Sequence, residues 1–137
     1  MKLSPARPRI SRLQTFAAAL ALCVASGQRA HAAVYTWDPG KTGTATGGGA
    51  GNWDLASTFW YNGTKDVAWP DNSTSSNTDT ALFGGTPGTG AVTNTAAIGV
   101  NTIEFDASGY KITNGTGGTL TLIGTNPTIY VNNTGSD

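Results

Sequence analysis

Apolar and polar residues alternate strictly through the second half of the chain. The alternation recurs in short pieces, over residues 91–93, 102–106, 110–112, 119–123 and 128–131. A two-residue period is that of a β-strand with one buried face. The segments between the pieces are rich in Gly, Asn, Ser and Thr, which favour turns. This stretch therefore predicts a series of short strands.

The pattern also predicts which side chains face inward. The expected inward pairs are Ile103/Phe105, Tyr110/Ile112, Leu120/Leu122 and Ile129/Val131. Their first positions, 103, 110, 120 and 129, are 7, 10 and 9 residues apart. Short strands at such near-regular spacing occur in sandwiches, in barrels and in the rungs of β-solenoids. Periodicity alone does not choose among these three architectures.

Residues 33–90 have a different character. Strands are predicted at residues 34–37 and 80–83, and the glycine density of residues 42–51 excludes a helix there. Large aromatic side chains can supply a core where little else is apolar. We expect such a core, an aromatic cap, from Trp37, Trp53, Trp60 and Trp69. No segment after residue 33 shows a 3.6-residue apolar period, so the predicted fold is all-β.

The amino terminus has the three parts of a secretory signal peptide. Basic residues precede an apolar run at residues 16–25, and Ala30 and Ala32 fit the small-residue rule of a cleavage site. The apolar run is too short for a membrane-spanning helix, which needs about 20 residues. We therefore expect residues 1–32 to direct export through the secretion machinery and to be removed after Ala32, with Ala33 as the new terminus.

Composition after residue 32 excludes several functions. Only Lys41, Lys65 and Lys111 remain against eight acidic residues, so the net charge is 3 − 8 = −5. Without arginine or a basic patch, the phosphate backbone of a nucleic acid has no evident binding surface. This part also lacks Cys, His and Met, which excludes disulfides, ordinary zinc or copper sites and thiol or serine–histidine catalysis. We expect no metal and no organic cofactor.

Carboxylates are the remaining candidates for catalysis, because a pair of them can hydrolyse a glycoside. The candidates are Asp54, Asp66, Asp71, Asp79, Glu104 and Asp106. The four aspartates up to position 79 lie among Gly, Asn, Ser and Thr, where aspartate commonly caps turns. Glu104 alternates with apolar neighbours and so faces away from the core. No catalytic residue is therefore predicted.

Three kinds of loop motif resemble known calcium-binding or glycosylation sites, and each is interpreted as having no such function. Residues 48–51 resemble the start of a calcium-binding glycine-rich nonapeptide, but Trp53 occupies the position that needs aspartate. Residues 71–79 are rich in oxygen atoms, yet they lack the glycine and the terminal glutamate of an EF-hand. Both are expected to be metal-free loops. The Asn-Xaa-Ser/Thr triplets follow from composition, and they begin at Asn62, Asn72, Asn114 and Asn132.

Several short sequence motifs follow one another in an order that is typical of a known family. They are residues 36–37 (Thr-Trp), 51–54 (Gly-Asn-Trp-Asp), 59–60 (Phe-Trp), Trp69, 79–83 (Asp-Thr-Ala-Leu-Phe), Val92, 103–105, 109–112 and 119–122. From about residue 34 to residue 131, this order resembles the amino-terminal part of bacterial proteins with autotransporter-associated β-strand repeats. The resemblance implies an exported protein that builds a long right-handed β-helix at, or released from, the cell surface. The family's glycine-rich repeat and translocator barrel are not found in this sequence, so we expect a fragment or truncated product.

The leading hypothesis is a non-enzymatic, adhesin-like or stalk-like passenger segment. It comprises a signal peptide (1–32), a Trp/Gly-rich cap (33–90) and the start of a solenoid (91–137) whose rungs use Ile103, Phe105, Tyr110, Ile112, Leu120 and Leu122. Its expected partners are the downstream repeats of its own full-length protein and a surface polysaccharide or host surface. The first alternative is a carbohydrate-binding sandwich in which exposed Trp53, Trp60 and Trp69 stack on sugars. The second is a β-helical polysaccharide-degrading enzyme, which the carboxylate settings and the absence of arginine disfavour.

Overall fold

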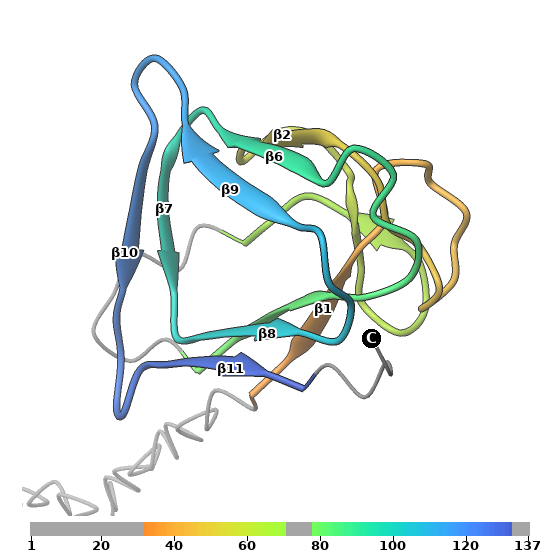
Figure 1. Cartoon of the computed structure of the whole chain (residues 1–137). Coiled ribbons are helices and arrows are strands. Elements are labelled where there is room, and N and C mark those ends of the chain that lie inside the picture. The colour runs from red at the N-terminus through yellow and green to blue at the C-terminus, as the bar shows by residue number, and fades with distance from the viewer. Residues whose placement is uncertain (1–31, 71–77, 133–137) are drawn as a thin grey trace, which may run out of the picture.

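The computed structural model describes residues 32–70 and 78–132, and these form an all-β structure with no helix (Figure 1). Within those ranges no helix could cross a membrane. Residues 1–31, which include most of the predicted signal peptide, most of the oxygen-rich loop (71–77) and residues 133–137 lie outside the described residues. The strands are β1 (Val34–Trp37), β2 (Gly51–Trp53), β3 (Trp60–Tyr61), β4 (Asp66–Val67), β5 (Thr80–Phe83), β6 (Ala91–Asn94), β7 (Ala97–Val100), β8 (Thr102–Phe105), β9 (Lys111–Asn114), β10 (Thr119–Leu122) and β11 (Thr128–Val131).

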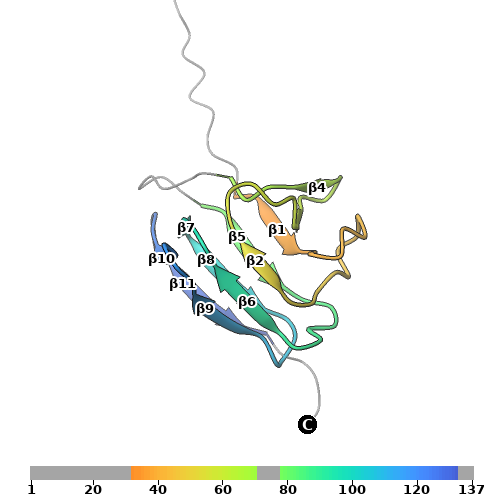
Figure 2. The same ribbon diagram turned by 90° about the horizontal axis from the view of Figure 1, so that it is seen from above.

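The strands form three sheets around a common interior. The orders are β11-β8-β5-β1-β3-β4, β2-β6-β9 and β10-β7. Pairing is parallel in all three, apart from the antiparallel β1–β3 and β3–β4 pairs. In Figure 1 the sheets outline a triangle, and Figure 2 shows the strands of each sheet stacked in layers.

The register shows how the chain returns to each sheet. It passes through β5, β6 and β7, then through β8, β9 and β10, and reaches β11 beside β8. Ala81 lies beside Ile103, and Ile103 lies beside Ile129, which sets circuits of 103 − 81 = 22 and 129 − 103 = 26 residues. Parallel neighbours need a long connection. Here the other two sheets supply that connection.

The alternating pattern located most strands correctly. The strands predicted at residues 34–37, 80–83 and 128–131 are confirmed, and those near 102, 111 and 119 agree within one or two residues. β7 was missed because Ile98, Gly99 and Val100 are all buried and do not alternate. A strand with both faces covered reads as a continuous apolar run.

Two asparagines hold corners between the sheets. The Nδ2 atom of Asn94, which is fully buried, donates to Oδ1 of Asn114 in the neighbouring strand at 3.2 Å. Nδ2 of Asn101 donates to the carbonyl oxygens of Ile123 at 2.9 Å and Thr125 at 3.2 Å. Both asparagines join one circuit to the next, and Asn101 also supplies a donor to two backbone carbonyls at its corner.

Gly85 allows the loop before β2 to lie directly against the corner after β5. Gly85 has φ +67°, and a Cβ atom there would lie 1.4 Å from the carbonyl oxygen of Gly47. Gly117 is a natural control, because its φ is +76° but a Cβ atom there meets nothing within 4 Å.

We predict that Gly85→Ala destabilises the protein by about 3 kcal/mol or more, since it adds a backbone clash to the strain of a left-handed residue. Gly117→Ala carries only the strain and should cost about 1–2 kcal/mol. Urea unfolding of the two variants measures the difference. Equal costs would show that the loop does not pack against this corner.

Candidate functional site

The four tryptophans meet in one buried cluster. Trp37 and Trp53 are 0% exposed, Trp60 is 1% and Trp69 is 2%. The ring centroids of Trp60 lie 4.8 Å from Trp53, 4.7 Å from Trp69 and 5.0 Å from Trp37. The interplanar angles of 56–67° are tilted or edge-on, an arrangement that aromatic quadrupoles favour.

Phe83 carries this cluster into the later strands. Its ring lies 5.5 Å from Trp60 and 5.7 Å from Trp53 on one side, and it stacks on Phe105 at 5.3 Å on the other. Phe83 and Phe105 are register partners in β5 and β8. The aromatic core therefore runs without a break from the first strands into the parallel stack.

The indole nitrogens of three of these tryptophans have different surroundings. Nε1 of Trp37 donates to the carbonyl of Gly49 at 2.8 Å, and Nε1 of Trp69 donates to the carbonyl of Gly99 at 3.2 Å. Nε1 of Trp53 is buried and has no hydrogen-bond partner among the described residues. Two of the indoles thus attach a loop or a strand to the core, while the third serves through packing alone.

The burial of these rings bears on the sugar-stacking alternative. Stacking on a sugar needs an exposed aromatic face, and Trp53, Trp60 and Trp69 are almost fully covered. No indole in the described parts of the chain offers such a platform.

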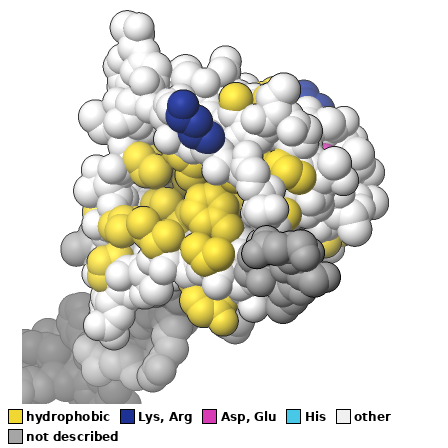
Figure 3. Space-filling view, viewed as in Figure 1, with side chains coloured by type: hydrophobic (Ala, Val, Ile, Leu, Met, Phe, Trp, Pro, Cys, Tyr) yellow, Lys and Arg dark blue, Asp and Glu magenta, His cyan; other side chains and the backbone are white. Residues whose placement is uncertain are grey.

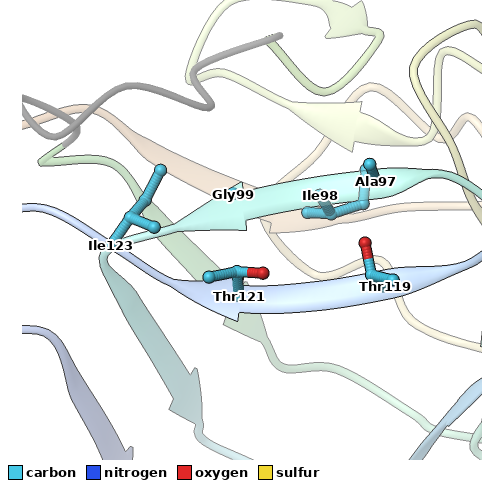
Figure 4. A pocket seen from close by; sticks show the side chains of 6 residues that line it. All are labelled: Ala97, Ile98, Gly99, Thr119, Thr121 and Ile123. Atoms are coloured by element: carbon cyan, nitrogen blue, oxygen red, sulfur yellow. The ribbon is translucent and has the colours of Figure 1, made fainter.

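A shallow hollow of about 130 Å³ lies on the sheet formed by β7 and β10 (Figure 4). Its lining is Ala97, Ile98, Gly99, Thr119, Thr121 and Ile123. The volume is below the roughly 300 Å³ of a typical small-molecule site. Its lining supplies two hydroxyls but no acid, base or metal ligand, so the hollow has no chemistry of its own.

The candidate carboxylates are dispersed. Asp54 follows β2 and accepts hydrogen bonds from the amide of Ala56 at 2.8 Å, from the amide of Ser57, and from the Ser57 hydroxyl at 2.8 Å. Burial raises the pKa of Asp54, but these three hydrogen bonds outweigh it, and the net pKa is lowered. Asp54 therefore caps a turn as an ionised group.

The other candidates lie elsewhere. Asp66 is in β4, Asp79 directly precedes β5, Glu104 is in β8 and Asp106 follows it. Burial raises the pKa of Glu104, and the neighbouring Asp106 raises it further. Asp71 lies outside the described residues. Across residues 32–70 and 78–132 no three Asp, Glu, His or Cys side chains gather around a point that could hold a metal.

Sequence reasoning missed one buried acid. Asp38, in the turn that follows β1, is 0% exposed. The Asp-Pro-Gly order at residues 38–40 indicates a turn, and turns are normally exposed. The glycine-rich loop that packs over Asp38 gives no apolar signal, so the pattern could not reveal this burial.

The interior is closed at one end by the tryptophans and open at the other in the described residues. β9, β10 and β11 each end a sheet order, so each has a free edge there. In Figure 3 hydrophobic side chains gather in the centre of the triangle that these strands outline. The partly exposed hydrophobic side chains of the later strands include Phe105, Tyr110, Ile112 and Leu120, and Leu122 is 37% exposed.

Two residues predicted to face inward belong to this open end. Ile129 and Val131 are 59% and 67% exposed, although their register partners are Ile103 and Phe105 of the core stack. They are exposed because no strand in the described residues pairs with β11 beyond them.

Comparison with known proteins finds similarity to an autotransporter adhesin. It is 40% identical over 95 residues to the adhesin BmaC autotransporter of Brucella suis biovar 1 (strain 1330). The chain is therefore similar to part of an autotransporter protein. The match covers 68% of this chain but only 3% of that protein, so the chain spans a small part of its relative. No family model matches the chain, and no solved structure matches it.

The indole hydrogen bonds give a matched pair of mutations. We predict that Trp37→Phe destabilises the protein by about 1 kcal/mol more than Trp53→Phe, because only Trp37→Phe leaves a carbonyl, that of Gly49, without its donor. Both changes remove a similar volume from the same cluster. Thermal or urea unfolding compares them, and a larger loss for Trp53→Phe would mean that its nitrogen does have a partner.

Proposed function

We propose that this chain is the capped start of a right-handed β-helix in the passenger of a surface-displayed, adhesin-like autotransporter protein, without enzymatic activity. The observation that carries the proposal is the parallel register of β5, β8 and β11, with β6 beside β9 and β7 beside β10. Strands that return to the same three sheets every 20–26 residues are the geometry expected of rungs.

Similarity to an autotransporter adhesin supports the location and the adhesive role. The relative is named as an adhesin, and the match spans 95 residues, which is 68% of this chain. The signal-peptide pattern at residues 1–32 agrees with export to the cell surface or beyond it. A host surface or a surface polysaccharide is the proposed ligand class for the full-length protein.

The two ends of the stack have different tasks in this proposal. At the amino end, Trp37, Trp53, Trp60 and Trp69 shield the first circuit from water and nucleate the stack, as a terminal cap must in a repeat protein. At the other end, the free edges of β9, β10 and β11 offer backbone donors and acceptors to a following circuit. The downstream repeats of the same protein are the proposed partner.

A structural, non-enzymatic role agrees with the chemistry of the described residues. Asp54 is engaged in a turn, Asp66 and Glu104 each interact with another aspartate, and the hollow on β7 and β10 has no charged group. None of these positions combines a cleft with a positioned acid and base, which glycoside hydrolysis requires. Because the indoles are buried, the carbohydrate-binding sandwich has less support than the solenoid.

The test uses the open end of β10. Leu122 shares the inward-facing side with Leu120, whereas Thr121 between them faces outward. If the open end stacks on a following circuit, the purified chain should self-associate through it, since an unpaired strand edge recruits another chain.

We predict that Leu122→Lys weakens self-association at least tenfold, which is about 1.4 kcal/mol, while Thr121→Lys leaves it nearly unchanged. Sedimentation over a concentration series measures both. Extending the chain with the residues that follow it in its full-length protein should abolish the association. A chain that stays monomeric at every concentration would favour a closed domain and contradict the proposal.

A further inference from the structure

The turn after β1 buries a carboxylate that is only half satisfied. Oδ2 of Asp38 accepts hydrogen bonds from the Thr42 hydroxyl at 2.8 Å and from the Gly43 amide at 3.0 Å. Its Oδ1 atom is buried and has no donor among the described residues. An unsatisfied carboxylate oxygen in this setting is costly, so a donor is expected close by.

Asp66 brings a second carboxyl to the same place. Its Oδ1 atom is likewise buried without a donor, and its side chain interacts directly with that of Asp38. The backbone places the two acids on either side of one short segment. The amide of Asp38 donates to the carbonyl of Phe59 at 2.7 Å on one side of β3, and Asp66 in β4 is the register partner of Tyr61 on the other side.

Two carboxyls in contact, one fully buried and the other half-buried, do not both remain ionised without a compensating cation. Burial raises the pKa of Asp66, and the charge of Asp38 and the hydrogen bond between the two side chains raise it further. The Gly43 amide and the charge of Lys41 act in the opposite direction, but the net pKa is raised. The Lys41 ammonium is directed elsewhere, over the Phe59 ring at 5.5 Å from its centroid.

We propose that Asp66, in its protonated form, donates a hydrogen bond to the buried Asp38 carboxylate, and that this shared proton fastens the loop of residues 39–50 onto β4. No external ligand is needed, because the proton itself satisfies both orphan oxygens. The pair is then a pH-sensitive contact that holds this loop in place at the capped end of the stack.

The loop that this pair fastens covers the aromatic cluster. Its Gly49 carbonyl accepts the Trp37 indole N–H at 2.8 Å, and a Cβ atom at Gly47 would lie 2.6 Å from the Asp38 Cβ atom. Loss of the proton would place two adjacent negative charges under this loop and loosen it. The indole of Trp37 would then gain access to water.

The sign of the pH dependence follows from the raised pKa of Asp66. Between the ordinary pKa of an aspartate and the raised one, the folded protein binds more protons than the unfolded chain. The stabilisation is therefore complete below the ordinary pKa and is lost as the pH rises through the raised pKa. The pKa of Glu104, beside Asp106, is also raised, so Glu104 gives a pH dependence of stability with the same sign. The experiment therefore replaces Glu104 in both variants.

The experiment compares the 137-residue chain carrying Glu104→Gln with the same chain carrying both Glu104→Gln and Asp66→Asn. The side-chain amide that Asp66→Asn introduces can donate to Asp38 at any pH. Between about pH 4 and about pH 8, the melting midpoint of the single variant should fall by a few degrees, and that of the double variant should fall markedly less. Indistinguishable profiles would overturn the proposal.

Carboxyl ¹³C titration in the unmutated chain gives a second readout that needs no variant to fold. The Asp66 signal should titrate above the ordinary range of an aspartate, and Asp38→Asn should bring it back towards that range. Titration at the ordinary pKa would contradict a shared proton. A melting midpoint that rises on adding calcium at about pH 8, but not with Asp66→Asn, would also contradict it, since a cation would then join the two acids.

Discussion

Four indole rings pack together, tilted or edge-on, in the core beneath the first strands, and the later strands apart from β7 and β10 pair in sequence with these first strands. Trp60 touches the other three rings, and Phe83 joins them to Phe105 in the next circuit. Such a dense aromatic core matters here because the chain is rich in Gly, Thr, Asn and Ser and has few other large apolar side chains. Without the cluster, the first circuit would bury too little apolar surface to hold its backbone in place.

The rest of the architecture extends that support by backbone pairing. Parallel ladders stack one circuit on the next. At two corners, Asn101 donates to backbone carbonyls of the next circuit, and Asn94 donates to the side chain of Asn114. The gain from each circuit depends on a neighbour on both sides. The two ends of the stack therefore differ. Aromatic rings close one end, and the other end has free strand edges and the partly exposed Phe105 and Leu120.

The sequence predicted this structure best where burial is one-sided. The strands at residues 80–83 and 91–94 alternate in burial and were located well, whereas β7 does not alternate because its last three residues are buried together. The tryptophans were recognised as a group from their spacing, but their mutual contacts depend on long-range pairing that no local pattern records. The meeting of Asp38 with Asp66 was beyond reach for the same reason, since 28 residues separate 38 from 66 and one side of the pair reads as an ordinary turn.

Tryptophan emission is the most direct test of the sealed end, because all four indoles of the chain belong to the cluster. The structure requires short-wavelength emission in the native state and slow quenching by acrylamide, with both changing together on unfolding. Emission at the wavelength of free indole in the native protein, with rapid quenching, would mean that the rings are exposed. The cap would then not exist, and the support proposed for the whole stack would fail with it.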